Sequence, residues 1–151
     1  MTAPNLPMEA GCRCDGVRMR ITVPPLITAA CHCTGCQRMT GSAFSLTVLV
    51  PAAGFAVTKG EPVIGGLHGE ANHHFCPYCL SWIFSRPQWR EGFINLRATM
   101  LDDTSWFSPF LETWTSEKLS WATTPAVHSY PGFPPPEDYP MLLKAYGEHA
   151  S

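Results

Sequence analysis

Charged residues are scarce in this chain. Lysine and arginine number 10 and aspartate and glutamate 12, which together make 15% of the 151 residues; the usual share is about 25%. No run of three or more lysines or arginines occurs, and the formal net charge is −2. The sequence therefore lacks the basic surface that nucleic-acid binding requires, and we expect no nucleic-acid partner.

Long hydrophobic runs are also missing. The longest apolar stretch, residues 44–57, is interrupted by Pro51 and Gly54 and is too short to cross a membrane. Residues 1–9 have neither a basic n-region nor an apolar h-region, so we expect no secretory signal. The sequence predicts a cytoplasmic protein without a membrane partner.

Hydrophobic residues make up 45% of the chain, and the length allows one domain with its own core. Apolar and polar residues alternate with period two over residues 17–23, which indicates a half-buried strand. Other short runs rich in β-branched and aromatic residues predict strands separated by Gly and Pro turns. These runs cover residues 26–30, 44–50, 55–59, 71–75, 81–84 and 92–97.

The C-terminal third has a weaker pattern. We expect a short helix or turn near residues 109–112, with Trp106, Trp114 and Trp121 packed in the core. A proline-rich, extended segment covers residues 131–140, and a helix of about two turns follows at residues 141–148.

Together these patterns predict a mainly β fold of small antiparallel sheets with a short C-terminal helix. We divide the chain into a loose leader (1–10), a β domain (11–130) and a proline-rich C-terminal extension packed on or beside it (131–151).

The chain has seven cysteines in three tight clusters. An odd number leaves one thiol over in any disulfide framework, and cysteines two apart on a strand are too distant for an unstrained bridge. Closely spaced thiolates are, in contrast, well placed to bind a soft metal ion such as zinc. The clusters are Cys12 and Cys14; Cys31, Cys33 and Cys36; and Cys76 and Cys79.

The sequence Cys76-Pro-Tyr-Cys79 has the spacing of a zinc knuckle, which supplies half of a four-thiolate site. Cys12 and Cys14 could complete that site and hold the start of the chain to its middle. The spacing leaves a second pairing open, in which the knuckle joins two cysteines of the middle cluster.

The middle cluster could bind a second ion through three thiolates and leave one position open, as catalytic zinc sites do. His32 lies between two of these cysteines and would point away from them in an extended segment, although it is an alternative ligand. His73 and His74 precede the knuckle, and we expect them to be surface residues or to lie outside the ligand shell. Iron is an alternative metal for such sites.

Three motifs resemble the glutathione-dependent formaldehyde-activating enzyme (GFA) family. They are GCRCDGVR at residues 11–18, CHCTGCQRMTGS at residues 31–42 and FCPYC at residues 75–79. The resemblance continues through Leu101-Asp102-Asp103 and Pro109 to Trp121.

The resemblance implies a zinc-containing β fold with two zinc ions per chain. A structural zinc would be held by Cys12, Cys14, Cys76 and Cys79, and a second zinc with an exchangeable position by Cys31, Cys33 and Cys36. The implied activity is that of a carbon–sulfur lyase that joins glutathione, or a similar thiol, to formaldehyde or another small aldehyde.

The chain departs from the family pattern at two positions. Leu80 follows the knuckle where the family usually has glycine, and a leucine at φ > 0 would cost roughly 1–2 kcal/mol. Gln37 stands where arginine is frequent, which leaves Arg38 as the candidate partner for a substrate carboxylate. The alternative function is a zinc-stabilised binding module with inert metals, which the low charge and many aromatic residues would suit.

Overall fold

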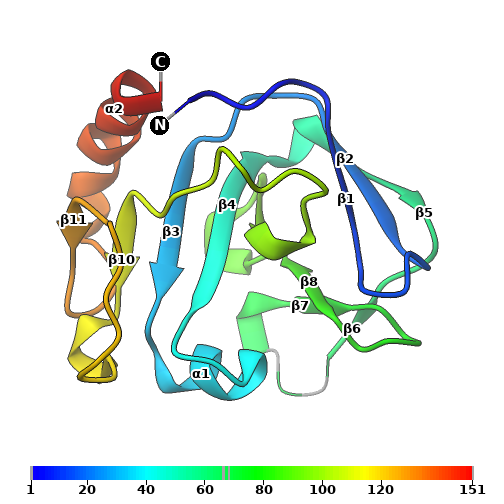
Figure 1. Cartoon of the computed structure of the whole chain (residues 1–151), viewed down its shortest axis with the longest axis horizontal. Helices are drawn as coiled ribbons and strands as arrows, with labels where there is room; N and C mark the ends of the chain where they lie inside the picture. The colour runs from blue at the N-terminus through cyan, green and yellow to red at the C-terminus, as the bar shows by residue number, and fades with distance from the viewer. Residues whose placement is uncertain (1, 66, 68, 151) are drawn as a thin grey trace.

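The computed structural model describes residues 2–65, 67 and 69–150. The protein is mainly β: a three-stranded sheet in the order β1-β2-β5 lies beside an eight-stranded sheet in the order β11-β10-β3-β4-β9-β8-β7-β6 (Figure 1). Helix α1 lies at one end of β3 and β4, and helix α2 lies along the β10–β11 edge near both chain termini. The predicted mainly β fold with a short C-terminal helix is confirmed.

The described strands are β1 (Met8–Gly11), β2 (Arg18–Ile21), β3 (Ile27–Cys31), β4 (Ser45–Pro51), β5 (Phe55–Lys59), β6 (Val63–Ile64), β7 (His73–Phe75), β8 (Trp82–Ser85), β9 (Phe93–Arg97), β10 (Leu111–Thr113) and β11 (His128–Ser129). The α-helices are α1 (Thr34–Thr40) and α2 (Tyr139–Ala150). Short 3-10 helices cover Ala52–Gly54, Gly69–Ala71, Gln88–Arg90, Ala98–Met100, Thr115–Glu117 and Pro136–Asp138.

The start of the chain differs from the expected loose leader. Residues 8–11 form β1, which pairs antiparallel with β2 and buries Met8 and Ala10 in the core. The alternation of buried and exposed side chains on a strand accounts for this arrangement, because Met8 and Ala10 lie on one face with Glu9 between them. Glu9 instead accepts a hydrogen bond from Arg20 Nε at 2.6 Å.

The eight-stranded sheet contains parallel pairs that the sequence did not predict. β10 runs parallel to both β3 and β11, whereas β3, β4, β9 and β8 pair antiparallel in succession. The expected helix or turn at residues 109–112 is wrong, because Leu111–Thr113 form a buried strand. The run is too short for periodicity to distinguish a strand from a turn.

Apolar side chains from both sheets form one core. On β2 they come from alternate positions, as expected for a sheet with one buried face, whereas every residue of β8 is buried. The fully buried members include Met19, Ile21, Val48, Val50, Ile83, Phe84, Ile94 and Leu96. This core fixes the ends of β3 and β9, where Cys31 and Arg97 lie.

Helix α2 packs on the outer part of the eight-stranded sheet. Leu142 and Tyr146 are buried against Ile27 and Phe110, with the Tyr146 and Phe110 rings edge to face at 5.5 Å. The helix therefore shields the parallel strands from solvent. Among the described residues, no helix has both the length and the apolar character needed to cross a membrane.

The three tryptophans of the C-terminal third do not share one environment. Trp106 is buried in the core, and Trp114 packs edge-on against Phe133 at a centroid distance of 5.7 Å. The core prediction is wrong for Trp121, which is 72% exposed in a turn outside the sheets. Its neighbour Ala122 takes the buried position.

Candidate metal centres

Four cysteines meet where the two sheets join. Cys12 and Cys14 lie in the turn between β1 and β2, and Cys76 and Cys79 lie in the turn between β7 and β8. Their sulfur atoms all lie within 4.8 Å of one another. A metal ion at this position would connect the three-stranded sheet to the eight-stranded sheet.

The spacing of these sulfurs suits a tetrahedral thiolate site. Cys14 Sγ lies 3.6 Å from Cys12 Sγ and 3.7 Å from Cys76 Sγ. A tetrahedron with zinc–sulfur bonds of about 2.3 Å has edges of about 3.8 Å. Backbone N–H groups of Val17 and Gly16 point at the sulfurs of Cys12 and Cys14, each at 3.3 Å, and would stabilise thiolates.

The knuckle turn closes through Leu80. Its N–H donates to the Cys76 carbonyl at 3.0 Å, and its φ of 60° places it in the left-handed region. The side chain is 69% exposed, so it adds little core packing to offset the strain. The departure at Leu80 thus falls at a position where glycine is the unstrained residue.

We expect Leu80→Gly to stabilise the protein by about 1 kcal/mol, because it removes the left-handed strain without loss of buried surface. Chemical denaturation of the metal-loaded protein measures the change. Leu80→Ala is the matched control, since alanine keeps the Cβ that causes the strain. Equal stabilities for the glycine and alanine variants would contradict the strain at this turn.

The other three cysteines meet at the junction of β3 and α1. Cys31 ends β3, Cys33 is the N-cap of α1, and Cys36 lies in the first turn of that helix. Cys33 Sγ accepts a hydrogen bond from the Cys36 N–H at 3.3 Å. The three sulfurs lie within 4.8 Å of one another, and the group contains no further histidine or carboxylate among the described residues.

The crowding of these thiols favours a cation. Hydrogen bonds from Cys31 and Cys36 lower the pKa of the Cys33 thiol to about 2. The same contacts with Cys31 and Cys33 raise the pKa of Cys36, because its ionisation would add charge beside an existing thiolate. A divalent ion would relieve this repulsion, so the donor set fits a soft metal with three protein ligands. All seven cysteines are free thiols.

His32 points away from the three-cysteine group. Its ring is fully buried, and Nε2 pairs with Glu112 Oε1 at 3.1 Å. Burial lowers the pKa of His32, which favours the neutral ring. Glu112 also accepts hydrogen bonds from Lys118 Nζ at 2.9 Å and Thr124 Oγ1 at 3.0 Å. The network therefore links β10 to His32, which directly follows β3 and lies between Cys31 and Cys33 in the sequence.

We expect Glu112→Gln to destabilise the fold by about 2 kcal/mol, because the amide would face the Lys118 and Thr124 donors with an N–H group of its own. Burial opposes ionisation, but hydrogen bonds from Lys118 and Thr124 lower the pKa of Glu112 below its usual 4.5. Its contribution is therefore complete above pH 4.5 and declines as the pH falls through the lower, folded-state value.

Denaturation of both proteins between pH 3 and 7 measures this effect. Glu61→Gln, at an exposed position, is the control and should leave the stability unchanged. The wild type should lose its advantage over Glu112→Gln as the pH falls. A constant difference across this range would contradict the role assigned to the Glu112 carboxylate.

A cavity of about 250 Å³ opens beside the three-cysteine group. Apolar side chains from distant segments form most of its wall, and Phe133 reaches it from the proline-rich segment. The polar groups that line it include His73, Asn95 and Arg97. The apolar residues are Met39, Ala71, Trp82, Pro87, Trp89 and Phe133.

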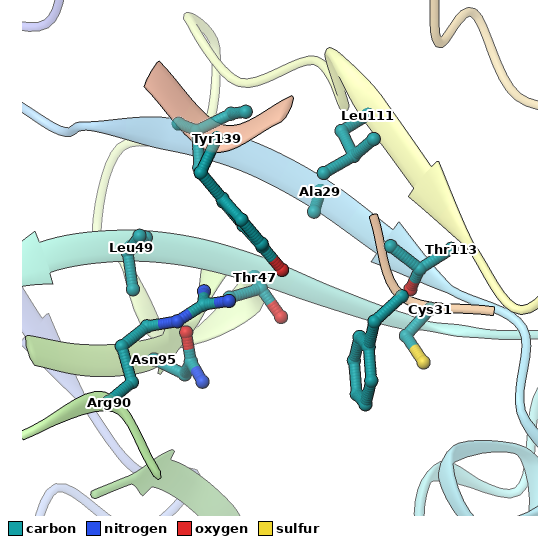
Figure 2. Close-up of a pocket in the computed structure, with 11 residues that line it drawn as sticks. Ala29, Cys31, Thr47, Leu49, Arg90, Asn95, Leu111, Thr113 and Tyr139 are labelled. Carbon is teal, nitrogen blue, oxygen red and sulfur yellow. The ribbon is translucent and has the colours of Figure 1, made fainter. Parts of the chain in front are cut away.

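A smaller cavity of about 90 Å³ shares Cys31, Thr47, Asn95 and Phe133 with the first. Figure 2 shows the Tyr139 ring and the Arg90 side chain directed toward Thr47, with the Cys31 sulfur at the other end. The Arg90 guanidinium lies 4.5 Å from the Tyr139 ring centre. The two cavities extend the space beside Cys31 along the face of β3, β4 and β9.

The arginines near this space differ from the sequence expectation. Arg38 is exposed in the last turn of α1, and its role as a carboxylate partner stays a prediction. Gln37 donates to the backbone carbonyls of His32 at 2.7 Å and Glu117 at 3.0 Å, so its side chain has a structural role. Arg97, which the sequence analysis did not single out, is the arginine that lines the larger cavity.

The remaining polar candidates lie elsewhere or have partners. His73 lines the larger cavity and pairs with Ser85 Oγ at 2.7 Å, whereas His74 stacks on Phe84. Asp102 forms an ion pair with Arg18 of β2. A charged residue at the end of a mainly apolar predicted strand was the available signal for Arg97; the sequence held no comparable signal for Phe133.

Comparisons with known proteins agree with this architecture. The family model described as "Glutathione-dependent formaldehyde-activating enzyme" matches residues 7–117. A crystal structure of a Rhodobacter sphaeroides protein is similar with a TM-score of 0.51 and 17% identity, covering 63% of this chain and 88% of that chain. At this identity the likeness shows the fold alone. A comparison with curated proteins gave no match.

Proposed function

Because the chain belongs to the glutathione-dependent formaldehyde-activating enzyme family, we propose that it is a zinc-dependent carbon–sulfur lyase that acts on thiol–aldehyde adducts. In the forward direction a thiol such as glutathione adds to formaldehyde and gives the S-hydroxymethyl product. The observation that carries the proposal is the three-cysteine group, which opens onto a mostly apolar cavity of about 250 Å³.

The seven cysteines would bind two zinc ions per chain. Zinc bound by Cys31, Cys33 and Cys36 would keep an added thiol deprotonated and therefore nucleophilic. The structural zinc would be held by the other four cysteines, which are Cys12, Cys14, Cys76 and Cys79. The free thiols suit a reducing compartment, and we propose the cytosol.

The protein's own residues would bind the substrates and exclude water. Trp82, Trp89 and Phe133 give the cavity apolar walls beside the cysteines, which strengthens electrostatic interactions within it. The side pocket toward Tyr139 provides room for the body of the thiol. The new carbon–sulfur bond forms as the carbonyl electron pair moves to oxygen, which then takes a proton from water.

Exposed apolar side chains favour the second candidate, a binding module with inert metals. Tyr78 and Leu80 are 86% and 69% exposed at the tip of the knuckle turn, and Trp121 is 72% exposed. Aromatic residues of this kind are enriched at protein interfaces. This candidate requires neither exchange at the metal nor turnover.

Proton NMR exchange spectroscopy of a mixture of formaldehyde and glutathione tests the proposed function, because it measures the rate of exchange between free formaldehyde and the adduct. We expect the zinc-loaded protein to accelerate formation and breakdown of the S-hydroxymethyl adduct above the uncatalysed rate. A panel of other thiols shows which one the cavity accepts. A folded, zinc-loaded protein without acceleration for any thiol would overturn the proposal and favour the binding module.

A further inference from the structure

Arg97 is a buried cation that forms no ion pair with a carboxylate of the described residues. It ends β9 with 7% exposure, and its Nε has no hydrogen-bond partner among the described residues. Within the described part of the chain, Nη2 donates a long hydrogen bond of 3.5 Å to the Asn95 carbonyl. The guanidinium lies over the Trp82 ring at 4.1 Å from the ring centre, a cation–π contact that stabilises the charged group at this position.

An unpaired buried charge is unfavourable, and folded proteins retain one where a ligand or function uses it. Arginine guanidinium groups match the geometry of carboxylates and other oxyanions. The described residues that line the cavity around Arg97 include no aspartate or glutamate. The Cys31, Cys33 and Cys36 thiolates attract the guanidinium through space, but among the described residues it donates no hydrogen bond to their sulfurs. Its donors are therefore available to a molecule in the cavity.

We propose that Arg97 is a binding site for an anionic oxygen of the substrate, placed beside the three-cysteine group. This inference rests on the proposed function. The oxygen has two possible sources, a carboxylate carried by the thiol or the alkoxide formed when the thiolate adds to the aldehyde. In either case Arg97 contacts the substrate directly, and Trp82 stabilises its charge.

Two thiols of similar size separate the sources: 3-mercaptopropionate, which carries a carboxylate, and neutral 2-mercaptoethanol. Their affinities for the zinc-loaded protein are measured by calorimetry, and their turnover with formaldehyde is measured by exchange spectroscopy. The variants are Arg97→Met, which keeps the length and removes the charge, and Arg97→Lys, which keeps the charge. Arg20→Met is the matched control, because Arg20 is an exposed arginine of β2 outside the cavity.

If the carboxylate is the source, Arg97→Met should weaken the affinity for 3-mercaptopropionate about 10- to 100-fold and leave the affinity for 2-mercaptoethanol unchanged. Arg97→Lys should recover part of that preference. If the alkoxide is the source, Arg97→Met should lower turnover with both thiols by a similar factor and leave both affinities unchanged. The control should match the wild type.

Unchanged affinities and turnover in a folded Arg97→Met protein would overturn the inference. So would loss of one zinc per chain from that variant with an unchanged preference between the thiols, because Arg97 would then serve only to balance the thiolate charge. The calorimetric arm needs no turnover, so a carboxylate site can be established or rejected even if the proposed function fails. If the proposed function alone fails, the wild-type protein will bind thiols but show no turnover with formaldehyde.

Discussion

The Cys14→Ser variant is expected to lose the folded β domain. Cys14 is exposed, so its replacement removes a metal ligand with little loss of packing. Structural zinc contributes about 10 kcal/mol or more to the folding of small zinc domains, which is comparable with the whole stability of a typical domain. The three-stranded sheet would then be held by the apolar core and by contacts such as the Arg18–Asp102 ion pair, without the metal link. Circular dichroism and metal analysis of the purified variant measure the outcome.

Cys14→His is the informative control for this prediction, because imidazole is also a zinc ligand and should restore part of the metal binding. Removal of metal from the wild type by a chelator should reproduce the defect of Cys14→Ser. A soluble Cys14→Ser protein with native stability would contradict the four-thiolate centre at the sheet junction.

The Cys33→Ser variant is expected to stay folded, retain one zinc per chain and show only the uncatalysed rate of adduct formation. Cys33 caps α1 through its sulfur, and serine is among the best N-cap residues, so the helix is preserved while the thiolate is lost. Metal content, melting temperature and formaldehyde exchange are measured on the same sample. The variant thus separates the second metal centre from the fold.

Cys33→Ala removes both the cap and the ligand and should be less stable than Cys33→Ser by about 1 kcal/mol. Its metal content should match that of the serine variant. Two zinc ions per chain in Cys33→Ser would exclude the three-thiolate centre, and wild-type turnover with one zinc would exclude its role in catalysis.

The sequence predicted much of the fold because its strands are short, alternating and bounded by Gly and Pro. The strand expected at residues 55–59 matches β5, and the other expected strands differ from the observed ones by one or two residues at their ends. The cysteine spacing left two pairings open, and the family resemblance implied the division into the two groups that the structure brings together. The local pattern of apolar and polar residues was therefore sufficient to place these strands.

The missed features depend on contacts between distant segments. β10 is three residues long and is defined by its parallel pairing with β3 and β11, which no local pattern encodes. Helix α1 starts inside the cysteine cluster because Cys33 acts as its cap, a role usually read from serine or aspartate. Phe133 enters the cavity only because the proline-rich segment folds back beside the sheet. Arg97 became a candidate only once its burial was known.

X-ray absorption at the zinc edge, before and after the addition of glutathione, tests the central claim most directly. With one four-thiolate and one three-thiolate centre, the protein should show an average of about 3.5 sulfur ligands per zinc, rising to about 4 when the thiol binds. The Cys33→Ser variant should show about 4 throughout. An average that does not change with glutathione or any other thiol that the protein binds would contradict an exchangeable position at the Cys31, Cys33 and Cys36 centre.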